Sequence, residues 1–100
     1  MSVKIVTYRI MPIKQQNFML PTGAEILSAT PEPSGKVCIH TLDWSGPVGN
    51  KDARRQVVAL KPGESYDLAQ GKELRLIDTL MWGNLPGLVV HVFEVVNAAA

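Results

Sequence analysis

The sequence has 100 residues, of which 46% are hydrophobic and 19% charged, and a chain of this size and composition forms one globular domain rather than a disordered polymer. Its formal net charge is only +1, with lysines and arginines spread along the chain, so general binding to nucleic acids or to an anionic membrane surface is not expected. The single cysteine, Cys38, excludes an intrachain disulfide and is typical of a reducing compartment.

The N-terminal segment MSVKIVTYRIMPIK does not fit a secretion signal, because its apolar run is short and is interrupted by Lys4 and Arg9. Nowhere does the chain approach the ~20 consecutive apolar residues of a membrane-spanning helix. We therefore expect a soluble cytoplasmic protein with no membrane partner.

The first half of the chain predicts four strands. Residues 2–10 and 16–20 are rich in β-branched, aromatic and other apolar residues, and each run stops close to a proline, which cannot donate to a β-ladder. Residues 24–30 end at PEPSG, a sequence typical of turns. Residues 36–44, KVCIHTLDW, alternate with a period of two. This alternation predicts one face with Cys38, His40, Leu42 and Trp44 and an opposite face with Val37, Ile39, Thr41 and Asp43.

The second half begins with a predicted strand at residues 54–60, RRQVVAL, followed by the turns KPGES and AQGK with the short piece YDL between them. Residues 88–96, LVVHVFEVV, are almost continuously apolar. Such a run is typical of a strand that is covered on both faces, either at the centre of a sheet or against a neighbouring subunit.

Residues 73–82, ELRLIDTLMW, have an ambiguous apolar spacing. The residues that also fit a helical stripe are Leu74, Ile77, Leu80 and Met81. We predict a strand, because Gly71 precedes this segment, Gly83 follows it, and neither end carries a helix N-cap followed by Glu or Gln.

Together these segments predict an all-β fold. The short strands bounded by turns indicate a small single-domain β-sandwich or barrel of about seven antiparallel strands over residues 1–100. Little helix is expected, and no linker or internal repeat divides the chain.

The best candidate for a binding site is the segment that begins at Trp44 and ends at Arg55. Its glycines, Gly46 and Gly49, would let backbone amides approach a ligand, while Lys51 and the two arginines supply donors for phosphate or carboxylate. The sequence therefore predicts an anion or partner site at Trp44, Lys51, Arg54 and Arg55. The alternative is a solvated connecting loop, followed by a strand with its two arginines on opposite faces.

A second candidate surface is Trp82 with the following GNLPG. An aromatic residue beside a Gly-Pro loop marks either a corner of the core, the commoner case, or the anchor of an interface. An interface here would use Trp82 and Leu85. The many apolar residues in IDTLMW and LVVHVFEVV also lead us to expect a homo-oligomer.

The chain shows no catalytic signature, since no serine stands in a G-x-S-x-G turn, the carboxylates are scattered, and both the phosphate loop and the dinucleotide fingerprint are absent. Cys38, His40 and His91 would meet only if their strands are neighbours, and the chain mostly lacks short chelating pairs. We therefore expect no enzymatic activity, no metal and no cofactor.

Two segments carry a resemblance to an uncharacterised family of small phage and prophage proteins. The chain resembles that family in an early MPxGAxIL-like segment and in a terminal LVxHxFE-like strand. The matching residues are Met19, Leu20, Pro21, Gly23, Ala24, Ile26, Leu27, Leu88, Val89, His91, Phe93 and Glu94. The likeness extends over most of residues 5–96 but is poor in the middle, where the chain has a different loop at 44–53. The resemblance implies a phage origin, an all-β fold and expression in the host cytoplasm, and it assigns no functional residue.

These observations lead to three hypotheses of function. The first is a non-catalytic, phage-encoded binding protein that counteracts host defence by binding a host protein or by sequestering a small anionic, nucleotide-like ligand. The second is a structural or accessory part of the virion, such as a decoration or tail protein. The third, a small enzyme, has the least support in the sequence.

Overall fold

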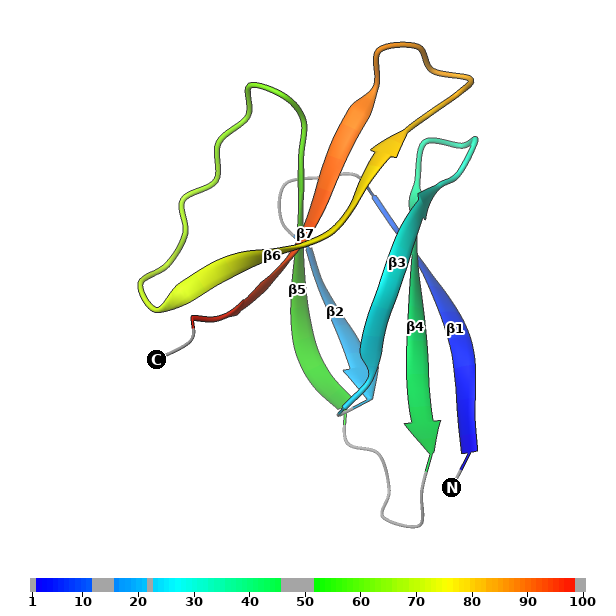
Figure 1. Ribbon diagram of the computed structural model, residues 1–100, viewed down its shortest axis with the longest axis vertical. Coiled ribbons are helices and arrows are strands. Elements are labelled where there is room, and N and C mark those ends of the chain that lie inside the picture. The colour runs from blue at the N-terminus through cyan, green and yellow to red at the C-terminus, as the bar shows by residue number, and fades with distance from the viewer. Residues whose placement is uncertain (1, 12–15, 22, 46–51, 99–100) are drawn as a thin grey trace.

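The computed structural model describes residues 2–11, 16–21, 23–45 and 52–98, and in this part of the chain it contains seven strands and no helix (Figure 1). The strands are β1 (Ser2–Ile10), β2 (Gln16–Pro21), β3 (Glu25–Pro31), β4 (Val37–Ser45), β5 (Asp52–Leu60), β6 (Lys72–Met81) and β7 (Val89–Asn97). The all-β prediction is confirmed, and the segment predicted as a strand at 73–82 forms β6, which ends at Met81.

The strands form two antiparallel sheets, so of the two predicted architectures the chain adopts the sandwich. One sheet has three strands in the order β1-β4-β3, and the other has four in the order β2-β5-β7-β6. The chain crosses between the sheets after β1, after β2 and after β4. At one side of the molecule the edge strands β3 and β6 meet (Figure 1), and there the Ala29 amide donates to Asp78 Oδ2 at 3.4 Å.

The core lies between the sheets and follows from the period-two alternation of the strands. In β4 the face with Val37 and Ile39 is fully buried, while Cys38 and His40 on the opposite face are half-buried. The buried hydrophobic residues that form the central cluster are Ile10, Ala29, Val37, Ile39, Val57, Ala59, Leu80, Trp82, Val90 and Val92. Each large aliphatic side chain buried in this way contributes about 1.5–3 kcal/mol to folding.

Strand β7 lies inside the four-stranded sheet, between β5 and β6, as its continuous apolar sequence predicts for a central strand. The ladder places Val57 of β5 and Arg75 of β6 on either side of Glu94 in β7. Side chains that are directly opposite each other in a ladder lie on the same face. Glu94 is therefore brought beside residues far from it in the sequence.

The β3–β4 turn and the long β5–β6 connection are each held by specific hydrogen bonds. The β3–β4 hairpin turns at Gly35, which has a φ of +95°, and its amide donates to the Glu32 carbonyl oxygen at 2.8 Å. The YDL piece after β5 forms no strand. Instead, the Tyr66 hydroxyl accepts a hydrogen bond from Gln56 Nε2 at 2.8 Å, which holds this connection near the face of β5 that carries the fully buried Val58.

Candidate functional site

The two arginines of the predicted site are consecutive in β5, so they lie on opposite faces of the strand. Arg54 is exposed, whereas the side chain of Arg55 turns inward and is only 20% exposed. Trp44 belongs to β4, where its backbone pairs with Val3, and its side chain is outside the part of the structure described. Lys51, with Gly46 and Gly49, also lies outside the described residues.

Arg55 belongs to a cluster that joins three strands of the four-stranded sheet. Its Nε donates to Glu94 Oε2, and its Nη1 donates to the Ala24 carbonyl oxygen at 3.0 Å. Arg75 Nη2 donates to the other carboxylate oxygen, Glu94 Oε1, at 2.9 Å. One carboxylate is thus held between two guanidinium groups, and we call this cluster the Arg–Glu–Arg bridge.

The three members of the bridge differ in their access to water. The Glu94 side chain is 3% exposed, whereas Arg75 is 65% exposed. Burial by itself raises the pKa of Glu94, but the hydrogen bonds and positive charges of Arg55 and Arg75 outweigh it and hold this pKa below its ordinary value of 4.5. Glu94 is therefore ionised at neutral pH and keeps both arginines in place.

A pocket of about 460 Å³ lies on one side of the bridge, between β3, β5 and β6. The bridge contributes its charged groups, and the remaining lining is mainly aliphatic. These other lining residues are Ala24, Glu25, Ile26, Leu27, Leu76 and Ile77. The volume of this pocket is within the range of about 300–1,000 Å³ that is usual for small-molecule sites.

A second hollow, of about 330 Å³, adjoins the other side of the bridge near the end of the sheet. Besides the bridge it is lined by Arg54, Lys72 and the C-terminal residues of β7. Lys72 Nζ donates to Asn97 Oδ1 at 2.7 Å, which fixes the ammonium group at this end. Four cationic residues therefore line this hollow, of which only Arg55 and Arg75 contact the Glu94 carboxylate, and we call it the basic groove.

The basic groove carries donors that the protein itself does not use. Within the described part of the chain, the Arg54 side chain makes no hydrogen bond or ion pair, and the Arg75 side chain uses only Nη2, for Glu94. A guanidinium group has five N–H donors in a planar fork that suits phosphate and carboxylate oxygens. Chemically, the groove can bind an anion.

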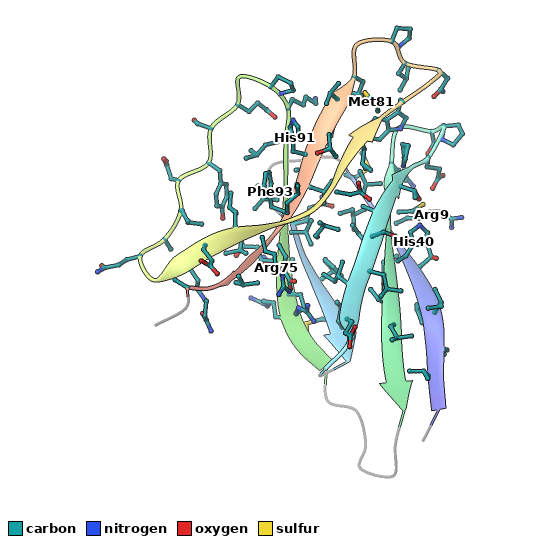
Figure 2. The ribbon with its side chains drawn as sticks, in the orientation of Figure 1. Arg9, His40, Arg75, Met81, His91 and Phe93 are labelled. Carbon is teal, nitrogen blue, oxygen red and sulfur yellow. The ribbon has the colours of Figure 1, made fainter. Side chains whose placement is uncertain are left out.

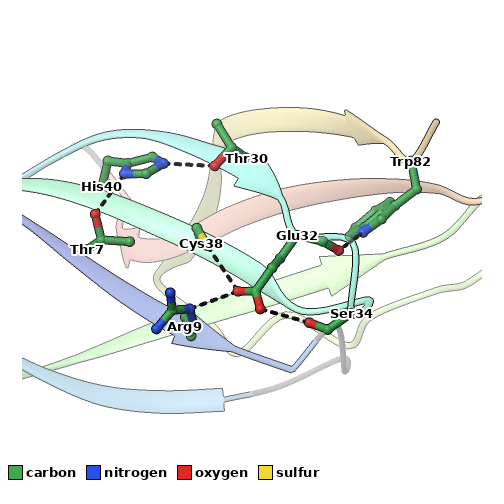
Figure 3. A network of polar contacts seen from close by, with 8 residues as sticks. All are labelled: Thr7, Arg9, Thr30, Glu32, Ser34, Cys38, His40 and Trp82. Atoms are coloured by element: carbon green, nitrogen blue, oxygen red, sulfur yellow. Dashed lines mark hydrogen bonds and ion pairs between the residues drawn. The ribbon is translucent and has the colours of Figure 1, made fainter. Parts of the chain in front are cut away.

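A separate polar network centred on Glu32 links the β3–β4 turn to β1 and β4 (Figure 3). Glu32 accepts from Arg9 Nε at 2.8 Å and from Ser34 Oγ at 2.9 Å, and the Cys38 thiol donates to the same carboxylate at 3.5 Å. Burial, followed by the hydrogen bond to Glu32 and then the Glu32 charge, raises the pKa of the Cys38 thiol. The hydrogen bond from Ser34 is the main cause of a lowered pKa at Glu32. The thiol is therefore protonated at neutral pH, and the network holds the β3–β4 turn against β1 and β4.

Trp82 anchors this end of the core. It is buried, and its indole Nε1 donates to the Glu32 carbonyl oxygen at 2.7 Å (Figure 3). Of the two sequence-based alternatives for Trp82, the structure thus shows the core corner, which leaves little indole surface for a partner. Leu85, in the same loop, remains exposed, so the predicted interface retains only this one side chain.

The residues considered for a metal site do not come together. Cys38 and His40 lie in the three-stranded sheet, and His91 lies in the other sheet (Figure 2). His40 is hydrogen-bonded to Thr7 Oγ1 and Thr30 Oγ1, and His91 is hydrogen-bonded to Thr79 Oγ1. Among the residues that the structure covers, no group of three or more His, Cys, Asp or Glu side chains could hold a metal ion.

The sequence pointed to Arg54 and Arg55 but not to Lys72, Arg75 or Glu94. One signal for Glu94 was present, because it is the only charged residue in the otherwise apolar run LVVHVFEVV. A carboxylate on the buried side of a central strand needs a cationic partner. Finding that partner required the strand order, which places β6 and β5 on either side of β7.

Comparison with known proteins found no relative of this chain. No family model, no curated protein and no solved structure matches the chain. In the described residues no helix is long and apolar enough to cross a membrane.

Proposed function

We propose that the protein is a non-catalytic binding protein that holds the anionic group of a small ligand at the basic groove. The observation that carries this proposal is the Arg–Glu–Arg bridge, in which a buried carboxylate fixes Arg55 and Arg75 at the edge of a pocket. With Arg54 and Lys72 nearby, the positive charges outnumber the carboxylate. An anion entering the groove would meet donors that are already positioned, which lowers the entropy cost of binding.

The residues that line the two hollows support a binding role without catalysis. The described residues that surround the two hollows include no serine, cysteine or histidine. Serine and cysteine are the commonest nucleophiles, and histidine the commonest general base, of enzymes that work without a cofactor. The arginines supply donors for an anion, but their guanidinium groups do not deprotonate in proteins.

The resemblance to phage proteins would make the ligand a small molecule of the host, and the protein a counter-defence factor that sequesters it. This part of the proposal depends on the resemblance alone. A host protein with an acidic surface is the alternative partner for the same groove, because aspartate and glutamate side chains present the same carboxylate chemistry.

Thermal unfolding with added anions tests the proposal. Inorganic pyrophosphate, compared with sodium chloride at equal ionic strength, should stabilise the protein by about 2.7 kcal/mol at a hundredfold excess over its dissociation constant. The Arg75→Gln variant should lose most of this stabilisation. Arg9→Gln is the matched control, because Arg9 also pairs with a carboxylate, Glu32, but lies outside the groove. An unchanged melting temperature in the wild type, or an equal loss in both variants, would count against the proposal.

A virion accessory protein is the second candidate, and the exposed apolar side chains favour it. Met81 is 71% exposed, and Ile5 and Leu76 are also exposed. Apolar surface of this kind is buried when copies of a subunit assemble. Mass spectrometry of purified particles and the mass of the protein in solution test this candidate. Absence from particles together with a monomeric mass would remove it, and with it the expected homo-oligomer.

A further inference from the structure

The two hollows beside the Arg–Glu–Arg bridge share its three residues but differ in chemistry. On the side of the basic groove, the additional charged groups are Arg54 and Lys72, both cations. On the other side, the 460 Å³ pocket adds the aliphatic side chains of Ile26, Leu27, Leu76 and Ile77. We call this second side the aliphatic pocket. Cationic and aliphatic surfaces thus meet at the bridge.

Two of the aliphatic residues that line the pocket are only partly covered by the rest of the protein. Leu27 and Leu76 are each about half exposed, on the edge strands β3 and β6 that meet at this side of the sandwich. Both residues line the aliphatic pocket, so an apolar group that occupies the pocket would cover part of their exposed surface. Removing such surface from water favours binding.

The charges of the aliphatic pocket argue against a second anionic group there. Arg55 and Arg75 are balanced in this pocket by Glu94, and Glu25 adds a further carboxylate to the lining. The lining of the aliphatic pocket thus contains two carboxylates and two cations, whereas the lining of the basic groove contains one carboxylate and four cationic residues, so an anion is favoured in the groove. The different charges of the groove and the pocket therefore favour different chemical groups at the two ends of a ligand.

We propose that the ligand is an amphipathic anion, in which one phosphate or carboxylate group occupies the basic groove and a compact apolar body occupies the aliphatic pocket. This inference rests on the proposed function, because it requires that the basic groove binds an anion. Arg75 would contact the ligand at the junction of its two parts. Figure 2 shows this side chain at β6, on the side toward β5.

Titration calorimetry with probes that share a head group tests the inference. Phenyl phosphate is compared with inorganic phosphate, and octanoate with acetate, at fixed pH and ionic strength. We expect the probe with an apolar body to bind at least tenfold more tightly than its matched head group in one of the two series. The series with the tighter binding then identifies the head group as phosphate or carboxylate.

Variants at the rim separate this inference from the proposed function. The double variant Leu27→Ser with Leu76→Ser should reduce the advantage of the apolar body to less than threefold while leaving the affinity for the bare head group unchanged. Met81→Ser is the control, because Met81 is exposed on β6 but does not line the pocket. Both altered leucines are exposed, and circular dichroism would verify that the sandwich is intact.

Each outcome has a definite meaning. If inorganic phosphate or acetate binds at the groove and the apolar body adds nothing, the amphipathic ligand is wrong and the anion site stands. If no probe binds, both proposals are wrong. If the advantage of the apolar body persists in the double variant, the body binds elsewhere and the inference is again overturned.

Discussion

Arg75 in β6 lies directly opposite Glu94 in β7, and its Nη2 donates to Glu94 Oε1 at 2.9 Å. A cross-strand pair of opposite charges contributes roughly 0.2–1 kcal/mol on an exposed sheet. Here the carboxylate is buried and is shared with Arg55 of a third strand. The pair therefore connects the packing of the four-stranded sheet to the groove that we propose as the binding site.

Replacing Glu94 should destabilise the fold. Glu94→Gln removes the charge but retains the shape, which leaves Arg55, largely buried, without its counter-ion. We expect the free energy of unfolding to fall by about 1–3 kcal/mol in urea denaturation. Arg75→Gln should cost less than about 1 kcal/mol, because the Arg75 side chain is mostly exposed and solvent screens its charge. Equal losses of stability in the two variants would contradict the view that the buried Glu94 matters more for folding than the exposed Arg75.

The lowered pKa of Glu94 predicts a loss of stability in acid. The folded state holds this carboxylate below its ordinary pKa of 4.5, so the unfolded chain binds the proton more readily. The stabilisation is complete above pH 4.5 and is lost as the pH falls through the folded pKa. Glu32 has a lowered pKa and contributes in the same range. Urea titrations between pH 3 and pH 7 should show a weaker pH dependence for Glu94→Gln than for the wild type, and an identical dependence would refute this role.

Trp82 should stabilise the fold through its hydrogen bond as well as through its packing. Trp82→Phe removes the indole N–H that donates to the Glu32 carbonyl oxygen at 2.7 Å and leaves a smaller ring in the core. We expect a loss of about 1–3 kcal/mol, which for a domain of this size lowers the melting temperature by several degrees. Met81→Ala, at the neighbouring exposed position, should change stability by no more than ~0.5 kcal/mol. A similar loss in both variants would show that the hydrogen bond is unimportant.

The β3–β4 hairpin requires glycine at position 35. Gly35 has a φ of +95°, a conformation that strains a residue with a Cβ atom, although no atom lies within 4 Å of the added methyl position. Gly35→Ala should therefore cost about 1–2 kcal/mol through the backbone alone. Gly83→Ala is a suitable control, because the space around Gly83 is equally open and its φ is not positive. Calorimetry that gives the same melting temperature for both variants would refute the strain.

The period-two pattern predicted most of the strands, and β4 shows why. Its buried residues Val37 and Ile39 alternate with the half-buried Cys38 and His40, so the sequence reveals both the strand and its two faces. Strand β6 was ambiguous for a physical reason. Its register shifts between Leu76 and Asp78, and an extra residue in a strand breaks the alternation, which leaves an apolar spacing that also fits a helix.

Only part of the proposed binding site could be predicted from the sequence. Arg55 was a candidate because it follows a glycine-rich segment, yet its partner Glu94 is 39 residues away in the chain, and Arg75 is 19 residues from Glu94. Local patterns cannot reveal which distant strands become neighbours. The pairing of β7 with both β5 and β6 decides that these three charges meet, and this pairing depends on the packing of the whole sheet.

The most direct test of the proposed anion site is the location of a bound anion on the protein. Pyrophosphate would be titrated into ¹⁵N-labelled protein while the backbone amide and arginine Nε–Hε resonances are followed by NMR. We predict saturable shifts concentrated at Arg55, Arg75 and the ends of β6 and β7 that line the groove. Shifts centred on Lys51, or no saturable shift at any position, would contradict the site.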